Sequence, residues 1–248
     1  MWIEVWSWRR VVGRAATWYE LAAAVLVGLA LVGAPRWESA AAPPPVPVYR
    51  VITREPVMAL SINVVWGTEF VPQILSTLMA AHVPATFFVG GAWAAANPAL
   101  VQQMVRDQMA VENHGYAHRH SNQLSFHENL NEIARAARAI QLAGAPRPTL
   151  YAPPYGEFNG TVLAAAEALH NLVILWTIDT IDWRPSSDAG LITARVLAKA
   201  QAGAIVLMHP TSRTLAALPG LVAGLHAAGY HLVTVPQLLG RGTPTGDG

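Results

Sequence analysis

Two histidines four residues apart, His114 and His118, are the first residues whose type and spacing could do chemistry. On helical backbone this spacing places both imidazoles on one face, where they can share a metal ion. Such a pair needs a third ligand from elsewhere in the chain. With nine histidines in the sequence, a chance pair at this spacing is expected roughly one time in three, so the pair alone is weak evidence.

Further polar or aromatic clusters follow apolar, strand-like runs. Together with the histidine pair there are five: residues 63–66, 114–118, 153–156, 179–183 and His209. The carboxyl ends of parallel strands meet at one end of a barrel, and catalytic residues collect there. We therefore expect the five clusters to form one site.

The segments between these clusters predict an α/β fold. Buried strands are expected at residues 57–64, 85–89, 150–152, 172–178, 204–208 and 231–235. Helices are expected at residues 70–82, 98–108, 125–143, 160–170, 189–200 and 215–228. Ser125 and Glu128 have the spacing of a capping box at the start of the longest helix. Regular alternation predicts a mostly parallel sheet, closed or nearly closed by helices into a barrel-like domain.

Composition narrows the function classes. The chain has 248 residues, 53% of them hydrophobic, which suits one domain plus an extension. Only 12% are charged and the net charge is +1, so no basic field indicates a nucleic-acid partner. The absence of cysteine excludes disulfides, thiolate metal ligands and a cysteine nucleophile.

The N-terminus predicts export. Arg9, Arg10 and Arg14 precede an apolar run from Leu21 to Ala34, so residues 1–34 are expected to be a signal peptide or an uncleaved membrane anchor, with the anchor slightly favoured. In both cases the rest of the protein is expected outside the cytoplasm, membrane-anchored or secreted. Residues 35–48 are predicted to be a proline- and alanine-rich linker, residues 49–240 the folded domain and residues 241–248 a flexible tail.

Five motifs in order resemble those of the polysaccharide deacetylases with the NodB homology domain, carbohydrate esterase family 4. They are Ala85-Thr86-Phe87-Phe88, His114-x-x-x-His118, Pro153-Pro154-Tyr155-Gly156, Asp179-Thr180-Ile181-Asp182-Trp183 and Leu207-Met208-His209. The resemblance spans residues 57–239. It implies a deformed (β/α) barrel that uses a divalent metal, typically zinc, to remove N-acetyl groups from glycans containing N-acetylglucosamine, such as peptidoglycan or chitin.

The resemblance also implies roles for individual residues. His114 and His118 match the metal histidines, and His209 matches the general acid that protonates the leaving amine. The remaining matches are Asp182, the carboxylate that orients this acid; Trp183 and Leu207, the apolar wall around the acetyl methyl; and Tyr155, whose backbone N–H helps bind the oxyanion.

The first motif departs from the family pattern. The stretch equivalent to the family's Thr-Phe-Asp-Asp-Gly is Ser61-Ile62-Asn63-Val64-Val65-Trp66-Gly67, so Asn63 stands for the catalytic base and Val64 for the metal aspartate. An amide cannot take up a proton at neutral pH, and loss of a general base typically lowers the rate about 10²–10⁴-fold. Ala152 replaces the arginine that usually holds the base. This form is similar to a divergent branch of the family in spore-forming bacteria, which suggests an envelope or spore-cortex context.

Two functions therefore stay open. In the first, the protein is a deacetylase of cell-wall glycan, with water or a substitute carboxylate, Glu69 or Glu112, beside the two histidines. In the second, it is a catalytically impaired relative that binds envelope glycan through Trp66, Tyr155 and Trp183. Retention of the histidines favours the first, and loss of the base, one ligand and the arginine favours the second. Trp183 and Trp66 could instead pack the barrel mouth, and for Trp66 packing is the favoured role.

Overall fold

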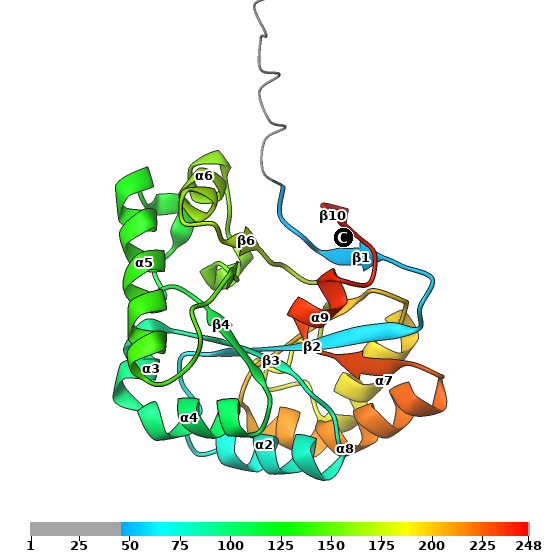
Figure 1. Cartoon of the computed structure of the whole chain (residues 1–248). Helices are drawn as coiled ribbons and strands as arrows, with labels where there is room; N and C mark the ends of the chain where they lie inside the picture. The colour runs from blue at the N-terminus through cyan, green and yellow to red at the C-terminus, as the bar shows by residue number, and fades with distance from the viewer. Residues whose placement is uncertain (1–45, 248) are drawn as a thin grey trace, which may run out of the picture. The chain divides into compact units, whose positions relative to one another are not determined.

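The structure is a computed structural model that describes residues 46–247 (Figure 1). The predicted signal or anchor segment, residues 1–34, and most of the predicted linker lie outside the described residues. In the part of the chain that is described, no helix has both the length and the apolar character needed to cross a membrane.

A curved parallel sheet runs through the domain, with strand β2 (Val57–Val64) at its centre (Figure 1). All eight residues of β2 are buried. The strand order is β6-β5-β4-β3-β2-β8-β7, and β9 pairs with the first half of β2. The other strands are β3 (Thr86–Val89), β4 (Ala110–Asn113), β5 (Leu150–Tyr151), β6 (Leu172–Val173), β7 (Ile178–Asp179), β8 (Ile205–Met208) and β9 (His231–Val233).

Helices pack on the sheet, most of them on its outer face. They are α2 (Val71–Ala80), α3 (Gly91–Ala96), α4 (Pro98–Arg106), α5 (Phe126–Leu142), α6 (Gly160–Ala168), α7 (Ala189–Lys199), α8 (Ser212–Ala227) and α9 (Val235–Leu239). The short α9 packs with its Val235 and Leu238 against the inner strand residues Ala59 and Phe88. α5 begins with the predicted capping box between Ser125 and Glu128. The sequence did not predict the short helices α3 and α9.

Side chains of β2 alternate between two hydrophobic clusters. Leu60 and Ile62 belong to the larger cluster, which includes helix residues such as Leu75 and Leu221. Ala59 belongs to a second cluster with residues of neighbouring strands such as Phe88 and Ile205. A strand buried on both faces is typical of a parallel sheet inside an α/β barrel. The predicted fold class, a deformed (β/α) barrel, is confirmed.

The sheet edges β6 and β7 do not pair with each other, and the start of the described chain fills the gap. Val48 forms a parallel bridge with Ile174, and Thr177 Oγ1 donates to the carbonyl of Tyr49 over 2.9 Å. The strand predicted at residues 172–178 is therefore split, because its middle pairs with this N-terminal segment rather than with a neighbouring strand. Val48 is only 2% exposed, so the folded domain includes the last residue of the predicted linker.

The C-terminal end also differs from its prediction. Strand β10 (Thr243–Thr245) pairs antiparallel with β1 (Arg50–Ile52), so residues within the predicted flexible tail 241–248 form ordered structure. The two segments are almost two hundred residues apart in the sequence. Local composition, rich in glycine and threonine, could not indicate this pairing.

Candidate active site

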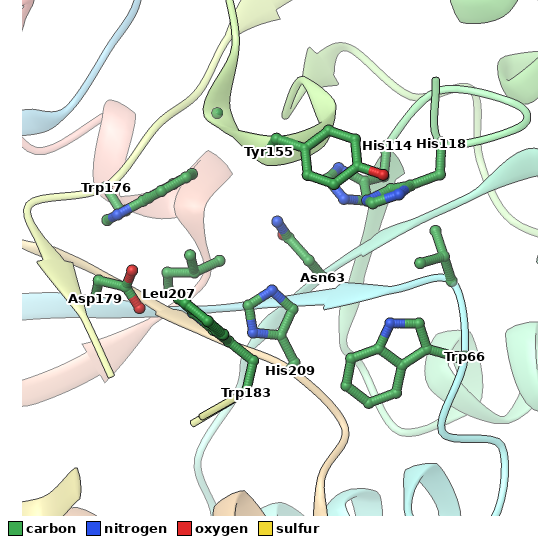
Figure 2. Close-up of a pocket in the computed structure, with 12 residues that line it drawn as sticks. Asn63, Trp66, His114, His118, Tyr155, Trp176, Asp179, Trp183, Leu207 and His209 are labelled. Carbon is green, nitrogen blue, oxygen red and sulfur yellow. The ribbon is translucent and has the colours of Figure 1, made fainter. Parts of the chain in front are cut away.

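A cavity of about 450 Å³ opens at the carboxyl ends of the strands. Eight of the nine predicted site residues line it, and the ninth, Asp182, is buried behind His209. Figure 2 shows these side chains converging from separate strand ends. The lining residues are Asn63, Val65, Trp66, His114, His118, Tyr155, Gly156, Trp176, Asp179, Trp183, Leu207 and His209.

His114 and His118 lie together, with ring centroids 5.1 Å apart, but in a loop rather than on a helix. His114 Nδ1 lies 2.6 Å from the carbonyl oxygen of Ala152. Because a carbonyl only accepts, Nδ1 carries the hydrogen and the lone pair of Nε2 is available. Burial, with a smaller effect of nearby His118, lowers the pKa of His114 to about 3. Burial, followed by the charges of His209 and His120, also lowers the pKa of His118.

Helix α5 holds the loop that carries both histidines. Its residue Glu132 is buried, and its Oε2 accepts hydrogen bonds from the backbone N–H groups of Tyr116 (3.1 Å) and Ala117 (2.8 Å). Asn113, at the end of β4, accepts from the N–H of Gly115 over 2.8 Å. Gly115 has φ +74°, a conformation that glycine adopts without steric cost. The loop therefore turns tightly and is anchored from behind.

His209 forms a buried hydrogen-bonded pair with Asp182. The distance from His209 Nδ1 to Asp182 Oδ1 is 2.8 Å, so Nδ1 donates to the carboxylate and Nε2 is left for a ligand. Thr214 also donates to Asp182, and Arg213 Nε donates to its backbone carbonyl over 2.9 Å. Trp66 stacks on His209 with 6.0 Å between ring centroids and remains 44% exposed at the mouth. This geometry suits a group that delivers or holds a proton.

Tyr155 forms another wall of the cavity. Its φ is +60°, which is uncommon outside glycine, and its side chain is 55% exposed. The ring contacts those of His118 and His120, with centroid distances of 4.5 and 4.1 Å. His120 Nδ1 lies 3.0 Å from Glu157 Oε1. His120 is exposed, and its ring stacks on that of Tyr155.

Four lining residues are not among the predicted site residues: Val65, Gly156, Trp176 and Asp179. Val65, Gly156 and Asp179 belong to the predicted clusters without a role of their own, and Trp176 falls inside the strand expected at residues 172–178. Asp179 Oδ1 accepts from the N–H of Ile181 over 2.7 Å, and the residue also lines the cavity. The signal that could have identified Trp176 is an aromatic residue directly before a motif cluster.

The two valines at the end of β2 differ in position. Val64, which matches the family's metal aspartate, is fully buried in the core cluster. Val65 is the valine that lines the cavity. Neither isopropyl group can bind a cation, so β2 supplies no charged ligand.

The two glutamates considered as substitutes also lie elsewhere. Glu69 is exposed, and neither it nor Glu112 lines the cavity. Glu112 Oε2 accepts from the backbone N–H groups of Thr149 and Leu150, both over 2.9 Å. Burial raises the pKa of Glu112 to about 7, although these hydrogen bonds act in the opposite direction.

Zinc, the cofactor that the family resemblance implies, is therefore not matched by a full set of ligands. Catalytic zinc sites use three protein ligands and an open position. Within residues 46–247 no group of three His, Cys, Asp or Glu side chains is arranged to hold a metal. His114 and His118 supply two neutral ligands, and the described residues do not complete the site.

Asn63 is the residue that motif matching aligns with the family's general base. Its side chain lines the cavity and is only 5% exposed. Its Oδ1 has no hydrogen-bond partner among the residues that the structure describes. Ala152, in place of the usual arginine, is also buried, so no cation lies at that position.

Comparison with known proteins identifies the family. The sequence profile of the polysaccharide deacetylases matches residues 50–173, half of the chain. The chain belongs to the polysaccharide deacetylase family. It is 34% identical to the uncharacterized protein YlxY of Bacillus subtilis over 79% of this chain and 61% of that protein. It is 36% identical to the peptidoglycan-N-acetylglucosamine deacetylase PgdA of Listeria monocytogenes over 71% of this chain and 37% of that protein.

One solved structure is especially informative for this polysaccharide deacetylase homologue. BA3943 of Bacillus anthracis, described as a CE4 family pseudoenzyme, superposes with a TM-score of 0.77 and 36% identity over 80% of this chain and 70% of that chain. A mutant of BA3943 with restored enzymatic activity superposes with the same TM-score. The chain spans less than two thirds of the length of YlxY and of PgdA.

Proposed function

We propose that this protein binds cell-wall glycan containing N-acetylglucosamine in the cavity, and that its hydrolysis of N-acetyl groups is lost or strongly reduced. One observation carries the proposal. The cavity has aromatic walls, while the base position is Asn63 and no carboxylate from residues 46–247 joins His114 and His118. Loss of the base alone corresponds to about 10²–10⁴-fold in rate. The similarity to BA3943 supports the same proposal.

The second candidate function is deacetylation of the same glycan. The intact His209–Asp182 pair favours it, since this pair would serve to protonate a leaving amine. Family membership and the deacetylase PgdA also favour it. The described residues offer no side-chain base to activate water, so this candidate requires a reaction much slower than that of a relative with the full motif.

Location is part of the proposal. A signal or anchor segment at residues 1–34 would place the cavity outside the cytoplasm, where cell-wall glycan is found. Attachment to the membrane through that segment, and a role in sporulation, remain predictions.

Acetate release and binding, measured on the same oligomers, separate the two candidates. The full-length protein is incubated with N-acetylglucosamine oligomers and peptidoglycan fragments, with and without added zinc, beside His114→Ala. We expect binding by calorimetry and acetate release at least 10²-fold below that of a relative with the complete first motif. Zinc-dependent release that disappears in His114→Ala would instead establish the second candidate.

A further inference from the structure

Asn63 places an unused hydrogen-bonding group inside the cavity. Figure 2 shows its carboxamide projecting from β2 into the space between His209 and the His114–His118 pair. Asn63 is only 5% exposed, and its Oδ1 has no hydrogen-bond partner within the described chain. A buried amide oxygen without a hydrogen-bond partner destabilises the folded state. Such a group is expected to persist where a ligand satisfies it.

The surroundings of Asn63 indicate the chemistry of that ligand. Val65, Leu207, Trp176 and Trp183 line the same cavity as Asn63 and give it apolar wall. A ligand that fits both features has one N–H donor and one carbonyl acceptor beside a methyl group. The acetamido group of an N-acetylated hexosamine has this composition, and a carboxamide can both donate to its carbonyl and accept from its N–H.

We propose that Asn63 is a ligand-binding residue that hydrogen-bonds the acetamido group, and that it makes the cavity select acetylated over deacetylated hexosamine units. This inference rests on the proposed function and specifies it. Replacement of the base by an amide would then serve recognition of the group that active relatives remove. The protein would then bind acetylated glycan in preference to deacetylated glycan.

Deacetylated units differ in charge as well as in size. Glucosamine carries an ammonium group and has no methyl group to contact the apolar wall. Burial of the ammonium group without a charged partner is unfavourable, because the group loses its hydration. Asp179 is the carboxylate that lines the cavity, and one of its oxygens already accepts from Ile181. It is therefore the residue most able to oppose the selectivity, and the test must include it.

Calorimetry with two ligands of equal length tests the inference. The full-length protein is titrated with the N-acetylglucosamine tetramer and with the fully deacetylated glucosamine tetramer. We expect the wild type to bind the acetylated tetramer at least tenfold more tightly. Asn63→Leu has nearly the same volume but no hydrogen-bonding group, so we expect it to bind the acetylated tetramer about tenfold more weakly and the deacetylated tetramer within about twofold of wild type. Asp179→Asn removes a carboxylate from the cavity lining and should weaken binding of the deacetylated tetramer. The matched control Glu167→Gln, exposed and outside the cavity, should change neither affinity.

The outcomes separate this inference from the proposed function. Binding of neither tetramer by the folded wild type overturns the proposed function. Equal binding of the acetylated tetramer by wild type and Asn63→Leu overturns the role of Asn63 and leaves the proposed function standing. Thermal unfolding checks that the variant is folded. If Asn63→Leu does not fold, Asn63→Ala gives the same comparison with less steric demand.

Discussion

At the scale of single residues, two adjacent valines at the end of β2 have different surroundings. Val64 and Val65 have the same side chain, yet the first is part of the core and the second faces the cavity. Val64 is the last residue of β2 and Val65 is the first residue beyond it, where the chain bends, so the two side chains meet different surroundings. The matching of sequence motifs assigns the metal position to Val64, whereas the geometry favours Val65.

An aspartate at each valine position tests this difference. We expect Val65→Asp to bind zinc at least tenfold more tightly than wild type, because a carboxylate would join the two histidines at the cavity. We expect Val64→Asp to lower the free energy of unfolding by about 3–5 kcal/mol, since it buries an unpaired charge in the core. Zinc calorimetry and urea denaturation measure both effects. A stable Val64→Asp that binds zinc, beside a Val65→Asp that does not, would assign the metal position to residue 64.

Glu112 provides a pH prediction. Its folded-state pKa is about 7 against an ordinary value of 4.5, so between these pH values the folded state binds more protons than the unfolded state. Stability contributed by the neutral carboxyl is complete below about pH 4.5 and is lost as pH rises toward 7. Glu112→Gln keeps an acceptor for Thr149 and Leu150 and cannot ionise. We expect the variant to gain on the order of 2–3 kcal/mol relative to wild type between pH 4.5 and 7.5.

Urea denaturation at a series of pH values checks this gain, with the exposed Glu167→Gln as the matched control. Protonation of His114 also affects the free energy of unfolding over this pH range. Its lowered pKa, about 3, means that stability falls as pH drops from 6.5 toward 3, because the unfolded state takes up the proton first. This effect is common to wild type and Glu112→Gln and cancels in the difference. A difference that does not change with pH would show that Glu112 is ionised in the folded state.

At the scale of elements, the site depends on supports that lie behind it. The histidine loop is held by Glu132 of α5, which satisfies two backbone N–H groups of that loop. Asp182 is likewise held by Thr214 of α8. Helices on the outside of the barrel thus fix side chains on the inside, and these supports are not part of any motif.

Removal of the α5 support should loosen the loop without unfolding the domain. We expect Glu132→Ala to lower the free energy of unfolding by about 2–4 kcal/mol, because it leaves the N–H groups of Tyr116 and Ala117 unpaired. Amide hydrogen exchange at these two residues should become faster. Glu132→Gln keeps an acceptor and should lose less, and Asn131→Ala, exposed on the same helix, is the control. Unchanged exchange at both amides in Glu132→Ala would rule out this support.

At the scale of the whole domain, the N-terminal segment completes the barrel. Val51 N donates to the carbonyl of Gly203 over 3.0 Å, and Arg50 forms a bridge with Ala204. A Cβ atom on Gly203 would overlap the carbonyl oxygen of Val51, and the residue has φ +78°. β1 can therefore approach β8 only because residue 203 lacks a side chain.

Gly203→Ala tests this close approach. We expect it to lower the free energy of unfolding by about 3–4 kcal/mol, which combines the cost of positive φ with displacement of β1. Gly229→Ala is the matched control, since Gly229 has φ +86° but open space around its Cβ position, and about 1–2 kcal/mol is expected. Thermal and urea denaturation measure both variants. Equal losses would show that backbone strain alone matters at Gly203.

The sequence by itself determined the order of strands and helices, the capping box at Ser125 and the eight predicted residues that meet in the cavity. These features follow from local periodicity and from motifs within a few residues, together with the rule that parallel strands end on one side. Only the tertiary structure decided which valine faces the cavity, that residues 172–178 divide around Val48, and that Trp176 lines the site. The split depends on the bridge between Val48 and Ile174, segments far apart in the chain, and the other two depend on where the backbone turns at the ends of strands, which periodicity does not specify.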